Sequence, residues 1–134
     1  ILSETIDFSN IASSLSANAG VTRENFIFVS LYISFINSLL EEFFFRGFVF
    51  LNLKNTSGRK TAYFISALAF AVYHTAMMTG WFNVFVFVLM LFGLFVGGII
   101  FNILNEKQGS IYTSWFVHMF ANFAINTVGF ILLT

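Results

Sequence analysis

Residues 26–53 read FIFVSLYISFINSLLEEFFFRGFVFLNL, and this stretch decides the fold. It is apolar apart from small polar side chains and three charged residues, Glu41, Glu42 and Arg46. A helix rises 1.5 Å per residue, so a helix over this stretch exceeds the roughly 30 Å hydrocarbon core of a bilayer. The stretch therefore predicts a membrane-spanning helix that carries charged side chains within the bilayer.

The composition of the whole chain points the same way. The 134 residues are 58% hydrophobic and 9% charged, with six basic and six acidic side chains and a formal net charge of zero. Ordinary globular domains have about 25% charged residues. So few charges exclude a small soluble domain, zero net charge excludes a basic surface for nucleic acid, and the lack of cysteine excludes a disulfide scaffold. We expect an integral membrane protein that has the lipid bilayer as a partner.

Three further apolar segments follow the first. They cover residues 61–80, 82–104 and 111–133. The polar stretches at residues 54–60 and 105–109 predict loops, and Trp81 stands where an interfacial aromatic residue belongs. The sequence thus predicts an all-α fold, a polytopic transmembrane helical bundle with about four spans.

Residues 1–25 differ in composition from residues 26–134. They are rich in polar side chains, while Ile11, Leu15 and Ala19 have helical spacing. We expect a polar N-terminal segment, in part a helix at the membrane interface, followed by a membrane core at residues 26–134. The chain starts with isoleucine and shows no signal peptide, so we expect that it belongs to a longer protein with further spans upstream.

The basic residues predict the orientation of the bundle. Those of the loops after the first and third spans lie on one side of the membrane: Lys54, Arg59, Lys60 and Lys107. Only Arg23 lies near a span end on the other side. By the positive-inside rule, the basic loops are cytoplasmic. The abundance of Phe, Ile and Asn without Pro is typical of an AT-rich bacterial genome, so we expect a multi-pass protein of a bacterial plasma membrane.

Polar residues from three spans fall in one layer of the membrane. Counted from the cytoplasmic ends at 1.5 Å per residue, Glu41 lies about 18 Å deep and His74 about 21 Å. On the same basis His118 lies about 13 Å deep and Asn122 about 19 Å. Ionisable side chains inside a bilayer are costly and mark functional sites. We therefore expect these four residues to form one site.

Each of these three spans also carries a polar stripe with helical spacing. The first stripe is Ser30, Ser34, Asn37, Ser38 and Glu41, the second is Ser66, Phe70, Tyr73, His74 and Met77, and the last is Ser114, His118, Asn122 and Asn126. Such stripes should face a shared interior rather than lipid. The third span has no stripe, and its glycines Gly93, Gly97 and Gly98 predict close helix packing, so we interpret this span as scaffold.

The charged residues of the first span suggest a division of roles. Glu42 and Arg46 are four residues apart with the glutamate first, the favoured order for a helical ion pair. Glu41 lies about 100° around the helix and is left without a partner, so it is the candidate general base. Glu42 and Arg46 would support it.

Each of these polar or aromatic residues, taken alone, could also have a purely structural role. Either histidine could simply bond a backbone carbonyl of a neighbouring helix. Asn122 alone is more typical of an interhelical contact, and Phe70 alone of packing.

Three motifs together resemble those of a known family. Residues 41–46, EEFFFR, resemble the EExxxR motif of the CAAX-protease and bacteriocin-processing family (CPBP, or Abi) of intramembrane glutamate-type endopeptidases. The pair Phe70 and His74 resembles its FxxxH motif, and the pair His118 and Asn122 resembles its HxxxN motif. The motifs come in the family's order on separate spans, and the resemblance covers about residues 26–130.

The resemblance implies an activity and roles for the residues. Glu41 and His74 would activate a water molecule that attacks a peptide carbonyl, and His118 and Asn122 would stabilise the oxyanion. Phe70 would pack beneath the site, in a cavity open to the cytoplasmic side. The partner would be a peptide or protein substrate: eukaryotic members cleave prenylated proteins, and bacterial relatives are linked to bacteriocin maturation and self-immunity.

Two alternatives stay open. In the first, Glu41, His74 and His118 bind a zinc ion that activates the water. The chain lacks an HExxH motif and Arg46 would repel a dication, so we expect no cofactor and keep zinc as the alternative. In the second, the protein is a non-enzymatic membrane immunity or transporter-like protein that uses its buried Glu and His for peptide binding or proton relay.

Overall fold

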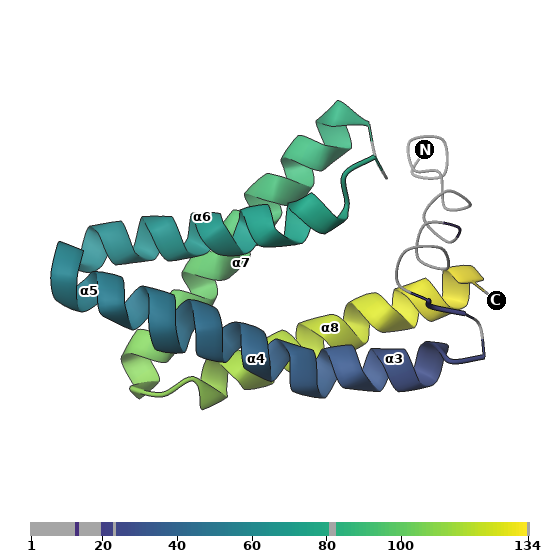
Figure 1. Ribbon diagram of the computed structural model, residues 1–134, viewed down its shortest axis with the longest axis horizontal. Helices are drawn as coiled ribbons and strands as arrows, with labels where there is room; N and C mark the ends of the chain where they lie inside the picture. Colours follow the sequence, from purple (N-terminus) through teal and green to yellow (C-terminus); the bar gives the residue numbers. More distant parts are fainter. Residues whose placement is uncertain (1–12, 14–19, 23, 81–82, 134) are drawn as a thin grey trace.

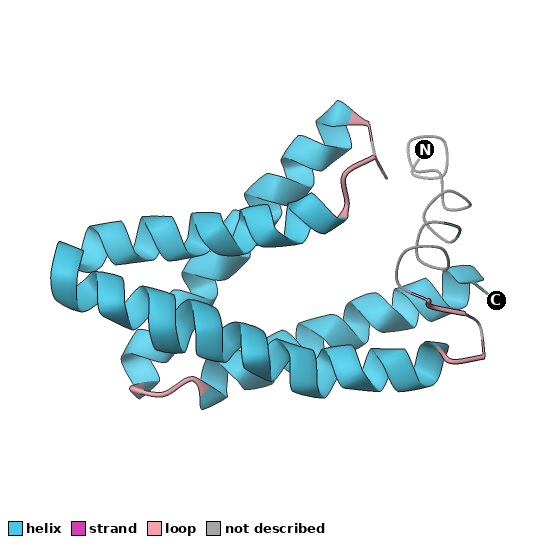
Figure 2. Ribbon diagram, in the orientation of Figure 1, coloured by secondary structure: helices cyan, strands magenta, loops and turns pink. Residues whose placement is uncertain are grey.

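The computed structural model describes residues 13, 20–22, 24–80 and 83–133, and every regular element in this part of the chain is a helix (Figure 2). The predicted all-α helical bundle is thus confirmed. Trp81 and the predicted interfacial helix at Ile11, Leu15 and Ala19 lie outside the described residues, so these two expectations stay predictions.

The first span forms one continuous helix of 32 residues, Phe26–Ser57. It comprises α3 (Phe26–Tyr32), η1 (Ile33–Asn37), α4 (Ser38–Glu42), η2 (Phe43–Phe50) and α5 (Leu51–Ser57). The segments η1 and η2 are π-helical, and they flank the one turn that carries Glu41 and Glu42. Such widened turns are rare and often occur at functional sites. The 3.6-residue periodicity of the sequence does not predict them.

Three more helices follow, α6 (Arg59–Met77), α7 (Val84–Gln108) and α8 (Tyr112–Leu133). The prediction of a loop at residues 54–60 is wrong, because α5 continues to Ser57 and only Gly58, with φ of 95°, separates it from α6. The turn predicted at residues 105–109 is likewise mostly helical, because α7 continues to Gln108 and is capped by Gly109, with φ of 69°. Polar composition marks where a helix leaves the apolar layer, whereas a glycine in the left-handed region marks where it ends.

Two helices in the described part of the chain are long and apolar enough to cross a bilayer. They are Phe26–Ser57, with a mean hydropathy of 1.4, and α7, with a mean hydropathy of 2.9. Large apolar side chains such as Phe28, Phe92 and Val84 are exposed on the outside of the bundle. That surface suits contact with lipid. A crossing by α6 and α8 remains a prediction.

The helices pack around the middle of the first one (Figure 1). Helix α6 folds back along it, α7 crosses α6, and α8 runs antiparallel to α3, η1 and α4. Polar side chains of α8 fasten this last contact. The Trp115 Nε1 donates to the Phe35 carbonyl at 3.1 Å, and Asn126 Nδ2 donates to Ser34 Oγ at 3.1 Å.

The two basic junctions of the chain lie at the same end of the bundle. Glu106, near the end of α7, pairs with Arg59 at 2.7 Å and with Lys54 at 3.5 Å. These ion pairs connect the α5–α6 junction to the end of α7. The junctions after the first and third spans therefore lie at one end of the bundle, as the topology predicted from charge requires.

The helices are held together by a buried arginine. Arg46 and Glu42 form the predicted ion pair at 3.2 Å, and both side chains are 0% exposed. Arg46 also donates from Nη2 to the Gly98 carbonyl at 3.0 Å and from Nε to Asn102 Oδ1 at 3.2 Å, both on α7. Charge-assisted hydrogen bonds of this kind are about twice as strong as neutral ones. The third span, interpreted as scaffold from its sequence, thus supplies polar contacts as well.

Of the glycines that predict close packing in the third span, Gly98 makes the contact. A Cβ at Gly98 would lie 3.0 Å from the Ala67 Cα of α6 and 3.3 Å from Arg46 Nη2. A Cβ at Gly93 or Gly97 would meet nothing within 4 Å. The packing role expected of Gly93 and Gly97 is therefore wrong within the described residues, because α7 turns a different face to α6.

The crowded surroundings of Gly98 and the open surroundings of Gly97 allow a matched pair of substitutions to test this packing. Gly98→Ala forces α6 and α7 apart at a point of backbone contact, and overpacking of this kind costs about 1–3 kcal/mol. Gly97→Ala should leave the unfolding temperature unchanged or raise it, because alanine is the better helix former and its methyl group meets open space. Thermal unfolding in detergent, followed by circular dichroism, measures both variants. Equal unfolding temperatures would contradict the packing at Gly98.

A second prediction concerns the buried ion pair. Arg46→Met leaves the Glu42 carboxylate buried without a counter-charge, and breaking a buried pair in this way costs about 3–5 kcal/mol. The double variant Arg46→Met/Glu42→Gln removes both charges and should regain much of this loss. Arg59→Met, which removes an exposed arginine from an ion pair, is the control and should change the unfolding temperature little. An Arg46→Met variant as stable as this control would contradict the buried pairing.

Candidate active site

Three ionisable side chains from three helices meet in the interior. Glu41 comes from α4, His74 from α6 and His118 from α8. The Glu41 Oε2 lies 3.2 Å from His74 Nε2 and 3.4 Å from His118 Nε2. Glu41 and His118 are buried, and the His74 side chain is 19% exposed. The structure therefore brings together three of the four residues that the sequence predicts in one layer.

The second nitrogen of each histidine has a hydrogen-bond acceptor beside it. His74 Nδ1 lies 2.9 Å from the Phe70 carbonyl, and His118 Nδ1 lies 2.8 Å from Glu42 Oε1. A carbonyl only accepts, and so does a carboxylate paired with arginine, so both Nδ1 atoms carry the proton and donate it. Both Nε2 atoms then face the same oxygen of Glu41. A lone pair facing a carboxylate oxygen is repulsive, so this arrangement suits a positive charge between Glu41 and the histidines, either a proton or a bound cation.

Glu41 has a further partner within its own helix. The amide Nδ2 of Asn37 donates to Glu41 Oε1 at 2.6 Å, which leaves Oε2 to the two histidines. The expectation that Glu41 lacks a partner is therefore wrong. That expectation considered only the charges along one helix, whereas the histidines come from helices that are distant in sequence.

Glu42 connects the arginine to the site. Its Oε1 accepts from both Arg46 Nη1 and His118 Nδ1, and its Oε2 has no hydrogen-bond partner among the described groups. Glu42 therefore orients the ring of His118, which is one way in which Glu42 and Arg46 can support the site. His118 itself lies between the two glutamates.

Asn122 is the one predicted site residue that makes its hydrogen bond elsewhere. It lies one turn after His118 on α8, and its Nδ2 donates to the Ile33 carbonyl at 3.4 Å. This contact between helices matches the alternative reading of Asn122. The distance is long for a hydrogen bond, so the contact is weak. The role of Asn122 as an oxyanion donor stays a prediction.

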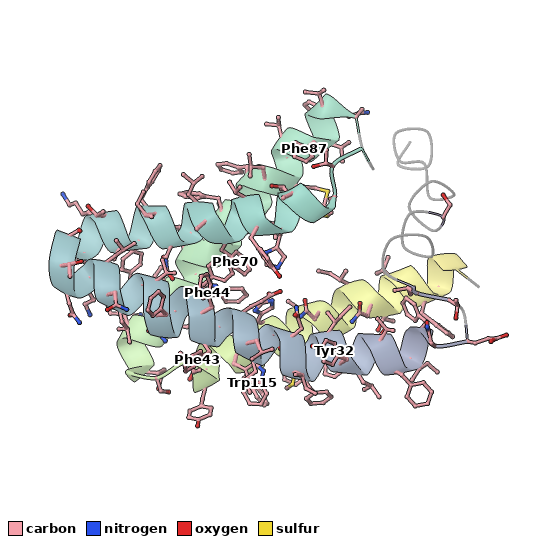
Figure 3. All side chains as sticks on the ribbon, viewed as in Figure 1. Tyr32, Phe43, Phe44, Phe70, Phe87 and Trp115 are labelled. Atoms are coloured by element: carbon pink, nitrogen blue, oxygen red, sulfur yellow. The ribbon has the colours of Figure 1, made fainter. Side chains whose placement is uncertain are left out.

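Phe70 forms the apolar side of the site. Its ring lies between α6 and the first helix (Figure 3) and packs against the ring of His74 at 4.3 Å and that of His118 at 5.7 Å between centroids. The Arg46 guanidinium lies 4.4 Å from the same ring centroid. Phe70 therefore packs against both histidines and the arginine.

Three residues that support this arrangement received no role from the sequence. Asn37 was one of several polar residues in a stripe, and nothing singled it out. Trp115 resembled the other abundant aromatic residues. Asn102 did carry a signal, because an amide inside the most apolar helix of the chain needs a partner.

The geometry also suits a metal ion. One ligand atom from each of Glu41, His74 and His118 can be chosen so that all lie within 4.8 Å of one another. Histidines that bind metals usually donate their other ring nitrogen to a carbonyl or carboxylate, as both do here. Arg46, expected to repel a dication, is paired with Glu42 and with α7. The residues present therefore fit the zinc alternative as well.

Comparison with protein families gives a match over most of the chain. Residues 23–124 match the family described as type II CAAX prenyl endopeptidase Rce1-like, and this region contains all three motifs identified in the sequence. Comparison with curated proteins gives no match, and comparison with solved structures gives none either. The matched region covers most of the chain, so the predicted resemblance is confirmed. The chain belongs to the type II CAAX prenyl endopeptidase Rce1-like family, a family of membrane-embedded proteases.

Proposed function

We propose that this protein is an intramembrane endopeptidase in which Glu41 and His74 activate a water molecule to hydrolyse a peptide bond. The observation that carries the proposal is the convergence of Glu41, His74 and His118, from three helices, in the interior of the bundle. Three ionisable groups are costly at such a place unless they have a use. Family membership supports proteolysis as that use.

The chemistry follows from the hydrogen bonds of the site. Glu41 Oε2 takes a proton from water as the water oxygen attacks the carbonyl carbon of the substrate. His74 adjoins the same oxygen, and its Nδ1 is held by the Phe70 carbonyl, so its Nε2 can exchange that proton with Glu41. When the tetrahedral intermediate collapses, the carbon–nitrogen bond breaks and the proton passes to the departing amine. The Asn37 amide holds the other oxygen of Glu41 in place.

The oxyanion would be stabilised from α8. His118 projects its Nε2 into the site because Glu42 holds its Nδ1, and Nε2 can donate to the oxyanion when both ring nitrogens carry a proton. Asn122 lies one turn away, and its weak contact with the Ile33 carbonyl leaves its amide free to turn to a substrate oxygen. Removing one such donor typically costs about 100- to 1000-fold in kcat.

The membrane setting and the substrate are part of the proposal. Four crossings would place the basic end with Lys54 and Arg59 in the cytoplasm, and the site would open towards it. The family description points to a protein that ends in a prenylated cysteine followed by three residues. A lipid-modified substrate suits a site reached from the bilayer.

A second candidate uses the same residues with a metal ion. Glu41, His74 and His118 would hold the ion, and the ion would supply Lewis-acid activation of the water. Glu42 would then fix the tautomer of a histidine ligand. The close approach of the three ligand atoms favours this candidate.

The first test replaces the proposed base. Glu41→Gln keeps the shape of the side chain but cannot accept a proton, so cleavage of a quenched fluorescent peptide ending in farnesylated Cys and three residues should fall at least ~100-fold. Glu24→Gln, the same change at an exposed glutamate outside the site, is the control and should leave the rate unchanged. Normal cleavage by Glu41→Gln would contradict the mechanism. Peptide binding without cleavage by the wild type would favour the non-enzymatic alternative.

The second test separates the two candidates. If Glu41 and His74 activate the water without a metal ion, protein purified in detergent keeps its cleavage rate after treatment with 1,10-phenanthroline. It also holds no stoichiometric metal by mass spectrometry. Loss of the rate with chelator, restored by zinc, would overturn the metal-independent proposal in favour of the second candidate. The Glu41→Gln variant should then also bind less metal.

A further inference from the structure

Asn102 stands out among the polar residues to which the proposed function gives no role. It lies in α7 and is fully buried, in the helix with a mean hydropathy of 2.9. Its Nδ2 donates to Ser66 Oγ at 2.7 Å and to the Tyr63 carbonyl at 3.3 Å, both in α6. Its Oδ1 accepts from Arg46 Nε at 3.2 Å. One amide therefore connects α7 to two other helices.

The contacts with Tyr63 and Arg46 fix how this amide faces. A carbonyl can only accept, so the nitrogen of Asn102 must point to Tyr63 and its oxygen to Arg46. Rotation of the amide by 180° would place an N–H group against the guanidinium and leave the Tyr63 contact repulsive. Asn102 thus offers Arg46 a fixed acceptor.

The fixed acceptor determines the orientation of the arginine. The guanidinium is planar, and its Nε and Nη2 bond Asn102 Oδ1 and the Gly98 carbonyl, one helical turn apart. With these two donors held, Nη1 is aimed at Glu42 Oε1 at 3.2 Å. The same Glu42 oxygen receives the Nδ1 proton of His118.

A continuous series of hydrogen bonds therefore runs from α7 to the site, through Asn102, Arg46, Glu42 and His118. We propose that Asn102 is a positioning residue of the reaction, which sets the ring of His118 through Arg46 and Glu42. This inference rests on the proposed function. A leucine at position 102 would satisfy packing in an apolar helix, but it would leave Arg46 Nε without an acceptor.

The test compares Asn102→Leu with Asn105→Leu, the same change at a buried position one turn along α7. With the farnesylated peptide as substrate, Asn102→Leu should lower kcat at least ~10-fold and change KM less than ~2-fold, because small misplacements near a reacting centre are costly. Asn105→Leu should keep the wild-type kcat. An unchanged kcat in folded Asn102→Leu would overturn the inference.

A second variant covers the case in which Asn102→Leu does not fold. Ser66→Ala removes one contact of the Asn102 amide and leaves Arg46 untouched. The amide should move less than the side chain does in Asn102→Leu, so kcat should fall about 2- to 5-fold. Ser114→Ala, the same change at a fully buried serine of α8, is its control. Equal kcat values in these two variants would count against the inference.

A spectroscopic readout keeps the inference separate from the proposed function. The chain has two histidines, so ¹⁵N-histidine labelling gives signals from His74 and His118 alone. Asn102→Leu should move the Nδ1 signal of His118 and leave that of His74 unchanged, because only His118 bonds Glu42. An unmoved His118 signal would overturn the inference even if the wild type cleaves no peptide. An inactive wild type with a moved His118 signal would overturn only the proposed function.

Discussion

The buried ion pair between Arg46 and Glu42 is the interaction on which the rest of the structure depends. Two charges inside an apolar bundle are tolerated only when every charged group is paired and hydrogen-bonded. Arg46 meets this requirement through Glu42, Asn102 and the Gly98 carbonyl, which brings α7 against the first helix. Glu42 is paired with Arg46 and hydrogen-bonded to His118, which brings α8 against the same part of the first helix. The cost of the buried charges thus determines where three helices meet.

The same constraint gives the two glutamates different partners. Glu42 is committed to structure, because its hydrogen-bonded oxygen is shared by Arg46 and His118. Glu41, one position earlier, faces His74 and His118 with one oxygen and Asn37 with the other. Adjacent carboxylates on one helix therefore face different partners. This arrangement leaves one of them able to exchange a proton.

The sequence predicted those parts of the fold and site that depend on one helix at a time. Periodicity and charge gave the four helices and the ion pair of Glu42 with Arg46, and depth counting placed Glu41, His74 and His118 together. The predicted end of the first helix was wrong, because polar residues at 54–57 continue the helix when they can reach Glu106 or water. The particular partners of Asn102 and Asn122 could not be predicted, because they depend on π-helical turns and on which face α7 turns to α6.

The central claim is that Glu41 holds both histidines through their Nε2 atoms, and ¹⁵N NMR of histidine-labelled protein in detergent tests it most directly. The account predicts that both rings have a protonated Nδ1, and that Glu41→Gln moves the Nε2 signals of both His74 and His118. Glu24→Gln should move neither. A Glu41→Gln variant in which either histidine keeps its wild-type Nε2 signal would contradict the account.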